Sequence, residues 1–271
     1  MSSAAAVSKV KRIVGISCGH MGTLDPLASG VLPVAFGNAS RLFNYLLDKK
    51  KTYRAVFRFG IDTDTLDSTG TILHEGGYIP DFAEIKDSLR FFVGKIEQVP
   101  PAFSAKSIGG VRAYHLARQG KEVALTAKRV SIYSIQLTAR LSENEFEFLI
   151  VCGGGTYIRS LARDIAAKCN TCAVMTALVR ERSGVFDLKD SVSPEMLMLN
   201  AENWQDFAVP PDAVFDMPAV DVSDRDAVKL RNGLKTACSY ADGEYKLYLN
   251  GEFYGIAQAD AGLLRAKVKL V

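Results

Sequence analysis

Residues 130–152, VSIYSIQLTARLSENEFEFLIVC, decide the fold class that this sequence predicts. β-Branched and aromatic side chains fill residues 130–141 and 145–152, and the polar Ser142-Glu143-Asn144 separates the two runs. Two such runs around a short polar segment are typical of an antiparallel β-hairpin. A hairpin in the middle of the chain does not fit the alternating strand–helix order of a parallel sheet. We therefore expect an α+β protein with a mixed, mainly antiparallel central sheet.

The neighbouring segments supply helices and further strands. The helix predicted after Gly153-Gly154-Gly155 has one apolar face, formed by Ile158, Leu161, Ala162, Ile165 and Ala166. Ser2 or Ser3 can cap a first helix, whose apolar stripe is Ala6, Val10, Ile13 and Val14. We also expect helices at 40–47 and 82–92, strands at 31–36, 53–59 and 94–99, and loops at 18–30 and 62–70.

A domain boundary is expected at Val209-Pro210-Pro211-Asp212, where two prolines interrupt the pattern. Beyond it, residues 219–271 contain short strand-like runs separated by Asp242-Gly243 and Asn250-Gly251, both of which are typical hairpin turn pairs. We predict one domain over residues 1–209, with an insertion at 100–130, and a small β-rich module over residues 210–271.

Composition indicates an ordinary globular protein. The 271 residues are 48 % apolar and 23 % charged, which suits a chain with a large core. There is no apolar run of the ~20 residues that cross a bilayer, and the N-terminal sequence lacks the pattern of a secretory signal. We therefore expect a cytoplasmic protein with no membrane association.

The five cysteines do not form the pattern of a disulfide framework, because their number is odd and their positions are scattered. Cys169 and Cys172 form a CxxC pair, which could indicate zinc or redox chemistry. A structural zinc site needs about four ligands, and the sequence has no second CxxC or paired histidine to complete one. We expect reduced thiols and no metal.

The net charge of +3 is unevenly distributed. Residues 1–58 hold nine Lys/Arg and two Asp, a balance of +7, and residues 104–130 hold six Lys/Arg and one Glu, a balance of +5. Residues 190–226 hold nine acidic residues and one Arg, a balance of −8. Such segregation favours a basic face for a polyanion, although solvated helix surfaces would give the same composition.

Residues 19–30, GHMGTLDPLASG, form the segment with the clearest chemical character. Asp25 is followed by Pro26, which stiffens the chain, and glycines on both sides permit sharp turns and close approach of a ligand. Such a loop can hold a carboxylate in a fixed place without covering it.

This segment, extended to Pro33, resembles the catalytic motif of the TruB family of tRNA pseudouridine synthases. Further motifs of the family follow in the same order along the chain, namely Lys51-Thr52-Tyr53-Arg54 with Thr63-Asp64-Thr65-Leu66-Asp67, Pro101-Ala102-Phe103-Ser104-Ala105-Lys106, Tyr114-His115-Leu116-Ala117-Arg118-Gln119-Gly120 and Gly155-Thr156-Tyr157-Ile158-Arg159. The resemblance covers residues 1 to about 205, and the tail from about residue 219 resembles more weakly the family's small RNA-binding module.

The resemblance implies a pseudouridine synthase fold with a PUA-like C-terminal domain. It also implies an isomerase that converts a uridine of the tRNA T-loop, uridine 55, to pseudouridine by base flipping. The expected partner is tRNA, bound through its T-stem and T-loop by the 100–130 insertion. No cofactor, metal or obligate protein partner is implied, and we expect a monomer.

The resemblance also implies roles for individual residues. Asp25 would be the catalytic carboxylate, acting as a nucleophile or as a base that removes a sugar proton. Arg159 would pair with Asp25, and Tyr53 would stack on the flipped uracil, where its hydroxyl could also transfer a proton. The expected substrate-binding or positioning residues are His20, Asp67, Tyr157, Leu178, Lys106 and Arg118.

One feature departs from the family. An apolar strand and a Lys-Pro pair usually precede the Ser-Ser that caps the first helix, whereas this sequence begins at Met1 directly before Ser2-Ser3. We hypothesise a shortened chain, or a start codon assigned too far downstream.

Two other functions are considered. Residues 60–65, GIDTDT, resemble the DxDxT motif of haloacid dehalogenase-type phosphatases, which require a doubly wound parallel sheet and Mg²⁺. The predicted hairpin argues against that fold. A non-catalytic RNA-binding protein is the second alternative, and the joint presence of Asp25, Tyr53 and Arg159 argues against it.

Overall fold

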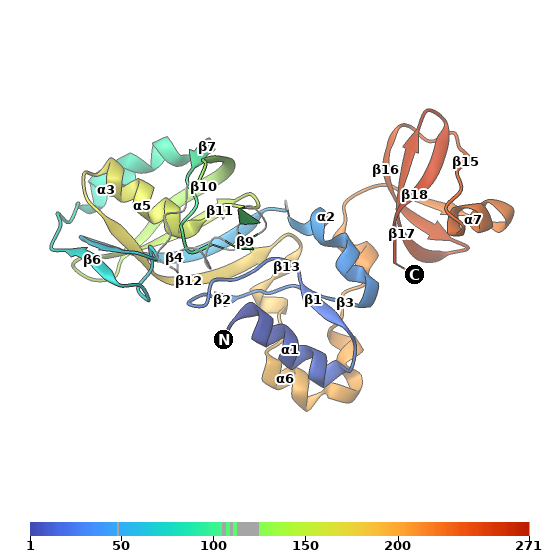
Figure 1. Ribbon diagram of the computed structural model, residues 1–271, viewed down its shortest axis with the longest axis horizontal. Helices are drawn as coiled ribbons and strands as arrows, with labels where there is room; N and C mark the ends of the chain where they lie inside the picture. The colour runs from blue at the N-terminus through green and yellow to red at the C-terminus, as the bar shows by residue number, and fades with distance from the viewer. Residues whose placement is uncertain (48, 105–106, 109–110, 113–124, 271) are drawn as a thin grey trace. The chain divides into compact units, whose positions relative to one another are not determined.

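The computed structural model describes residues 1–270 except 48, 105–106, 109–110 and 113–124 (Figure 1). The chain forms two compact units. The first contains Met1–Thr23, Leu32–Leu46 and Val192–Val271, and the second contains Leu24–Val31 and Leu47–Ser191.

A seven-stranded sheet forms the centre of the second unit, in the order β13-β12-β4-β11-β10-β7, with β2 paired to β12. Neighbours along this path pair antiparallel, whereas β2 and β12 pair parallel. The predicted mixed, mainly antiparallel sheet is therefore confirmed. Its strands are β2 (Ser29–Gly30), β4 (Lys51–Phe59), β7 (Gly94–Gln98), β10 (Lys128–Arg140), β11 (Glu145–Cys152), β12 (Ala173–Ser183) and β13 (Phe186–Asp187).

The predicted hairpin is confirmed as β10 and β11, which pair from Ile132↔Cys152 to Arg140↔Phe146. On its other edge, β11 pairs with β4 from Cys152↔Lys51 to Glu145↔Arg58. Burial alternates along β4, as expected for a strand with one face on the core. This strand begins two residues before the predicted Tyr53, at Lys51.

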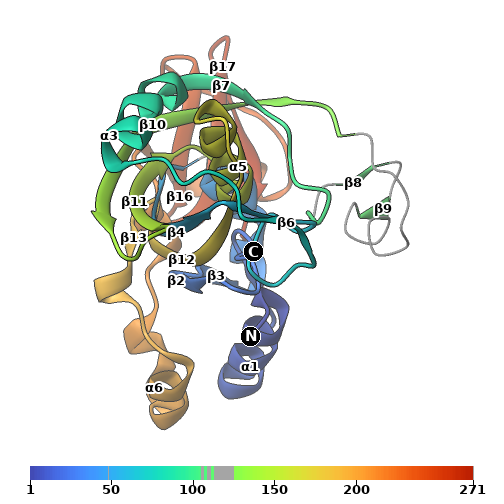
Figure 2. The same ribbon diagram turned by 90° about the vertical axis from the view of Figure 1, so that its left-hand side faces the viewer.

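Two helices, α3 (Phe82–Ser88) and α5 (Ile158–Lys168), pack with the buried face of this sheet (Figures 1 and 2). Asp81 caps α3 by accepting a hydrogen bond from the Glu84 N–H at 2.8 Å. The helix predicted at 82–92 is shorter than expected, because its last turn tightens into the 3₁₀ segment η2 (Leu89–Phe92). The shared core contains Phe57, Phe59, Phe146, Phe148, Ile85, Leu161 and Ile165.

The strand β12 was not predicted. Its burial does not follow a simple alternation, and it includes a fully buried arginine, Arg180, where a sequence reading expects an exposed residue. The remaining strands of this unit form the pairs β5 (Ile61–Thr63) with β6 (Ile72–Glu75) and β8 (Ser107–Ile108) with β9 (Val111–Arg112), and η3 spans Leu188–Asp190. The segment 62–70, expected to be a loop, thus begins inside β5.

The first unit begins with α1 (Ser3–Val14), which Ser2 caps by accepting a hydrogen bond from the Ala5 N–H, as predicted. The segment expected to be a loop, 18–30, contains β1 (Cys18–His20), which pairs with β3 (Val34–Phe36). The helix expected at 40–47 is η1 (Gly37–Leu42) followed by α2 (Phe43–Leu47). The other helical segments here are α6 (Pro194–Leu199), η4 (Ala201–Phe207) and η5 (Pro211–Val214).

The end of the chain forms a five-stranded sheet in the order β14-β16-β17-β18-β15. The predicted turn Asn250-Gly251 joins β16 to β17, and both residues have positive φ, as a type I′ turn requires. Asp242-Gly243 is not a hairpin turn, since β16 begins there, and the next hairpin turns at Ala261-Gly262 instead. The elements are β14 (Ala219–Val222), α7 (Asp224–Arg231), β15 (Thr236–Ala237), β16 (Gly243–Leu249), β17 (Glu252–Asp260) and β18 (Leu263–Lys269).

Among the described residues, we find no helix with the length and apolarity that a bilayer crossing requires.

Candidate active site

Asp25 lies in a loop whose two ends are fixed by hydrogen bonds. The Ala28 N–H donates to the Asp25 carbonyl at 2.9 Å, and Pro26 occupies the second position of the resulting turn. Leu27 and Ala28 then pack against the core, and β2 joins the edge of β12. Asp25 is therefore held by the turn that begins at it and by the strand β2 that follows the turn.

Arg159 contacts both oxygens of this carboxylate. Its Nε donates to Asp25 Oδ2 and its Nη2 to Asp25 Oδ1, both at 3.0 Å, in the bidentate geometry of strong arginine–carboxylate pairs. The remaining N–H groups of Arg159 reach the Thr65 carbonyl at 2.8 Å and the Phe103 carbonyl at 3.0 Å. Arg159 is the second residue of α5, so these contacts place the Asp25 carboxylate close to a helix N-terminus.

Asp67 forms a second ion pair with the guanidinium of Arg159. Its Oδ2 lies 3.6 Å from Arg159 Nη1, and its side chain is 7 % exposed. The other oxygen, Oδ1, accepts hydrogen bonds from Thr65 Oγ1, from the Thr69 N–H and from Thr69 Oγ1, at 2.6 to 3.0 Å. Asp67 is thus fixed within its own turn before it meets the guanidinium.

Tyr53 and Leu178 line the same buried region from adjacent strands, β4 and β12. Both side chains are largely buried. Burial raises the pKa of the Tyr53 hydroxyl to about 12, against the opposing effect of Arg180, so this group is a neutral phenol at physiological pH. An aromatic ring and an aliphatic side chain form walls suited to a planar base.

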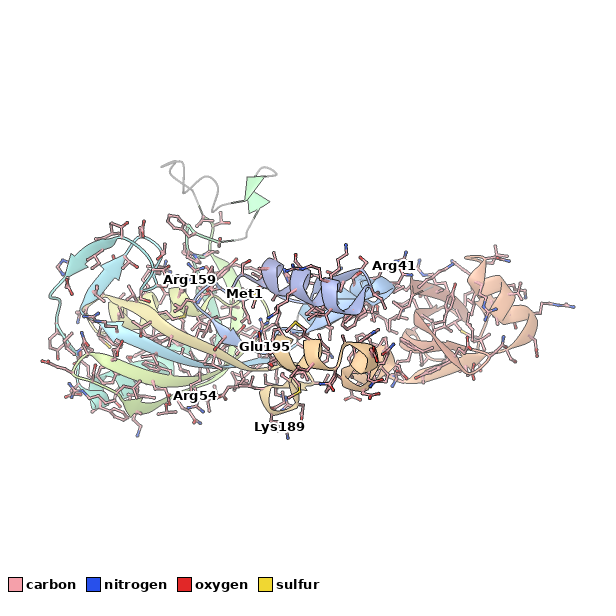
Figure 3. All side chains as sticks on the ribbon, turned by 90° about the horizontal axis from the view of Figure 1, so that it is seen from below. Met1, Arg41, Arg54, Arg159, Lys189 and Glu195 are labelled. Atoms are coloured by element: carbon pink, nitrogen blue, oxygen red, sulfur yellow. The ribbon has the colours of Figure 1, made fainter. Side chains whose placement is uncertain are left out.

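The opposite face of the sheet carries different chemistry. There Arg54 forms ion pairs with Glu147 at 2.8 Å and Glu181 at 2.7 Å, and Figure 3 shows Arg54 and Arg159 on opposite sides of the sheet. These pairs are partly exposed, and we assign them no part in the site.

Tyr157 immediately precedes α5 and is partly exposed. The buried amide of Gln98 holds its backbone from both directions, because the Tyr157 N–H donates to Gln98 Oε1 at 2.8 Å and Gln98 Nε2 donates to the Tyr157 carbonyl at 3.1 Å. Gln98 therefore fixes the start of the helix that carries Arg159.

Three expected residues lie outside the part of this unit that the structure describes. His20 lies in β1, in the other compact unit, where it pairs with Val34. Lys106 and Arg118 lie outside the described residues. Burial raises the pKa values of the Cys169 and Cys172 thiols.

Sequence reasoning missed Arg180 and Gln98. Arg180 is two residues from Leu178 on β12, so a strand prediction there would have placed it beside Tyr53. Gln98 carries no comparable signal in the sequence. The phosphatase alternative is wrong, because residues 60–65 enter an antiparallel hairpin, β5 and β6, instead of following a parallel strand.

The arrangement can orient an accessible carboxylate against one face of a bound base. The Asp25 side chain is 31 % exposed although both of its oxygens are paired. Each carboxylate oxygen has further acceptor capacity, so Asp25 can still receive a proton or attack a carbon.

Residues 10–158 match the family described as TruB family pseudouridylate synthase (N-terminal domain). The chain is 39 % identical to tRNA pseudouridine synthase B of Acaryochloris marina, across 100 % of this chain and 95 % of that protein. It is 38 % identical to tRNA pseudouridine synthase B of Clostridium perfringens strain 13, across 96 % of this chain and 92 % of that protein.

Two solved structures have the same fold. The archaeal box H/ACA sRNP Nop10–Cbf5 complex aligns with a TM-score of 0.72 at 21 % identity, over 100 % of this chain and 83 % of that one. A Cbf5–Nop10–Gar1 complex aligns with a TM-score of 0.71 at 23 % identity, over 96 % of this chain and 75 % of that one. The predicted fold, including a β-rich C-terminal part of PUA-like type, is confirmed.

Proposed function

This chain belongs to the TruB family of pseudouridylate synthases, and we propose that Asp25 is the carboxylate with which it converts the T-loop uridine of tRNA, uridine 55, to pseudouridine. The observation that carries this proposal is the bidentate pairing of Asp25 with the buried Arg159. That contact fixes a carboxylate in one orientation while its outer face stays accessible.

The reaction is an internal rearrangement, so one carboxylate can serve it. The N1–C1′ bond breaks, the C5–C1′ bond forms, C5 loses its proton and N1 gains one. Nothing is oxidised and no group is imported. Asp25 supports either route for the first step, attack at C1′ as a nucleophile or removal of a sugar proton as a base.

Arg159 orients Asp25, because a bidentate guanidinium fixes both oxygens of the carboxylate. Tyr53 stacks on the flipped uracil, and Leu178 packs against it from the adjacent strand. Asp67 positions Arg159. We propose these roles because the groups meet within one compact unit, around the loop of Asp25.

The remaining proposed contacts are with the RNA. His20 and Tyr157 contact nucleotides near the target, and Lys106 and Arg118 neutralise phosphates of the T-stem and T-loop. Residues 210–271 add a second RNA-binding surface to the catalytic domain of residues 1–209. The enzyme acts in the cytoplasm as a monomer, without an obligate protein partner.

The test is tritium release from an unmodified tRNA transcript labelled at uracil C5, because each isomerisation releases one C5 proton. Asp25→Asn keeps the shape of the side chain and removes its charge. Its matched control is Asp87→Asn, which changes an exposed acid on α3 of the same unit.

We expect release at uridine 55 by the wild type and by Asp87→Asn, and none by Asp25→Asn, with all three proteins binding tRNA. Equal release by Asp25→Asn would refute the role of Asp25. Binding without release by every protein, the folded wild type included, would favour the non-catalytic alternative.

A further inference from the structure

We propose that Arg180 is a positioning residue that fixes the Tyr53 hydroxyl relative to the loop that carries Asp25. The inference rests on the proposed function, because it assumes that Asp25 and Tyr53 act on the same uridine. It concerns a side chain that the mechanism above does not use.

Arg180 lies in β12, between the strand that carries Tyr53 and the short strand that follows the Asp25 loop. It pairs with Tyr53 of β4 on one side of β12 and with Gly30 of β2 on the other. Its side chain is the largest among the fully buried ones of the described residues, and the residue is 1 % exposed. Burying a guanidinium is costly unless its N–H groups are satisfied, so a site that retains one uses specific contacts.

Those contacts lie in two directions. Arg180 Nε donates to the Val31 carbonyl at 2.7 Å, and the Val31 N–H donates back to the Arg180 carbonyl at 2.9 Å. The guanidinium also forms a side-chain hydrogen bond with the Tyr53 hydroxyl. One rigid planar group therefore connects the end of the Asp25 loop with the phenol.

The backbone at the end of the Asp25 loop packs directly against that of Arg180. A Cβ on Gly30 would lie 2.3 Å from the Arg180 carbonyl oxygen and 2.8 Å from its nitrogen, closer than real Cβ atoms approach. The backbones of Gly30 and Arg180 thus leave no room for a Cβ at position 30. Four residues lie between Asp25 and Gly30, and three of them belong to the turn at Asp25–Ala28.

Arginine suits this position better than lysine. Its fork has donors that point in fixed, different directions, so it can reach Val31 and Tyr53 together. A lysine ammonium is a single point on a flexible chain, and it would leave one of the two buried acceptors without that donor. The positive charge of Arg180 also lowers the pKa of Tyr53 against the larger effect of burial.

The experiment compares Arg180→Lys with Arg182→Lys, each with and without Tyr53→Phe. Arg182 is the matched control, because it lies two residues along β12, is exposed, and donates to the Gly184 carbonyl outside the site. Single-turnover pseudouridine formation and tRNA affinity are measured separately, and circular dichroism and thermal unfolding establish that each variant is folded.

We expect Arg180→Lys to slow single-turnover formation by about 10- to 100-fold, as small misplacements of reacting groups do, with a change in tRNA Kd of less than about 3-fold. Arg182→Lys should leave both quantities unchanged. In the Tyr53→Phe background the loss caused by Arg180→Lys should shrink, because the phenol partner is already absent.

An equal fold-loss in both backgrounds would overturn the proposal, since Arg180 would then act independently of Tyr53. An undiminished rate for Arg180→Lys would also overturn it. If Arg180→Lys does not fold, the Tyr53→Phe variant alone tests the proposal. It removes the hydroxyl that Arg180 contacts and leaves the aromatic ring and Arg180 in place. Wild-type turnover by that variant would refute the inference, and a slower rate at unchanged tRNA affinity would support it.

Asp25→Asn is included in the same series. Product lost in Asp25→Asn but formed at the wild-type rate in Arg180→Lys would refute the present inference and leave the proposed function standing. Product retained in Asp25→Asn would refute the proposed function itself.

Discussion

Arg159 donates a hydrogen bond of 3.0 Å to each carboxylate oxygen of Asp25. The two side chains nevertheless differ greatly in exposure, at 5 % for Arg159 and 31 % for Asp25. The arginine faces the protein interior, where two backbone carbonyls and Asp67 occupy its other N–H groups. The carboxylate faces outward. The protein thus fixes the position of a reactive group through its partner and leaves the group itself accessible.

This relationship predicts that Arg159→Lys loses turnover more than it loses tRNA binding. Lysine keeps the positive charge but cannot contact both carboxylate oxygens and the Thr65 and Phe103 carbonyls together. We expect the single-turnover rate to fall by about 100-fold, with tRNA Kd nearly unchanged. Rapid-quench measurements on a labelled transcript check this. Arg163→Lys, a partly exposed arginine of the same helix, serves as control, and equal losses in the two variants would contradict the prediction.

Asp67→Asn should lower both stability and rate. An amide at this position keeps an acceptor for the Thr65 and Thr69 donors but turns an N–H group toward Arg159. A buried donor facing a donor costs about 1–3 kcal/mol in the free energy of unfolding. Urea unfolding measures this cost, and Asp64→Asn, at a partly exposed position of the same turn, should cost less. A larger effect for Asp64→Asn would show that Asp67 does not support Arg159.

Cys152 makes stability depend on pH in the alkaline range. Burial raises the pKa of its thiol from 9.0 to about 11, although Thr156 and Lys51 act in the opposite direction. The unfolded chain releases this proton first, so the contribution of the group is complete below pH 9 and is lost as the pH rises toward 11. The free-energy difference between the wild type and Cys152→Ala should therefore shrink, by at most about 1.4 kcal/mol per pH unit. Urea unfolding at several alkaline pH values measures it, and a difference that is constant with pH would contradict the assignment.

The sequence predicted those parts of the fold whose pattern is local. The hairpin of β10 and β11 follows from two regular runs around a polar turn, and the helix α5 from one apolar face. The pairing of β4 with β12 was missed, because it joins segments more than a hundred residues apart and places a charged residue, Arg180, in the core. Non-local pairing depends on the assembled sheet and leaves little trace in a single strand.

The residues of the candidate site also differ in whether the sequence indicates them. Asp25, Tyr53 and Arg159 can be proposed from the sequence, because their side chains belong to recognisable motifs. Their supports cannot, since the carbonyls of Thr65 and Phe103 act through the backbone, which every residue has. The paired hydrogen bonds of Gln98 with Tyr157 likewise depend on where β7 ends beside α5.

Gly30→Ala should disable the enzyme through the backbone alone. Gly30 has φ of +102°, and an added Cβ would lie 2.3 Å from the Arg180 carbonyl oxygen, a backbone atom that cannot swing aside. The strand β2 must then separate from β12, which moves the loop that carries Asp25. We expect a loss of about 2 kcal/mol or more in the free energy of unfolding, and a fall of about 100-fold in single-turnover rate.

Gly155→Ala separates the effect of conformation from that of contact. Gly155 also has positive φ, at +77°, but the nearest atom to its added Cβ is Lys128 Nζ at 3.1 Å, the mobile end of a long side chain. Its cost in unfolding free energy should be near the conformational penalty of about 1 kcal/mol. Urea unfolding of both variants makes the comparison. Equal losses of unfolding free energy in the two variants would mean that β2 can separate from β12 at no additional cost. The close packing of the Asp25 loop against Arg180 would then not contribute to stability.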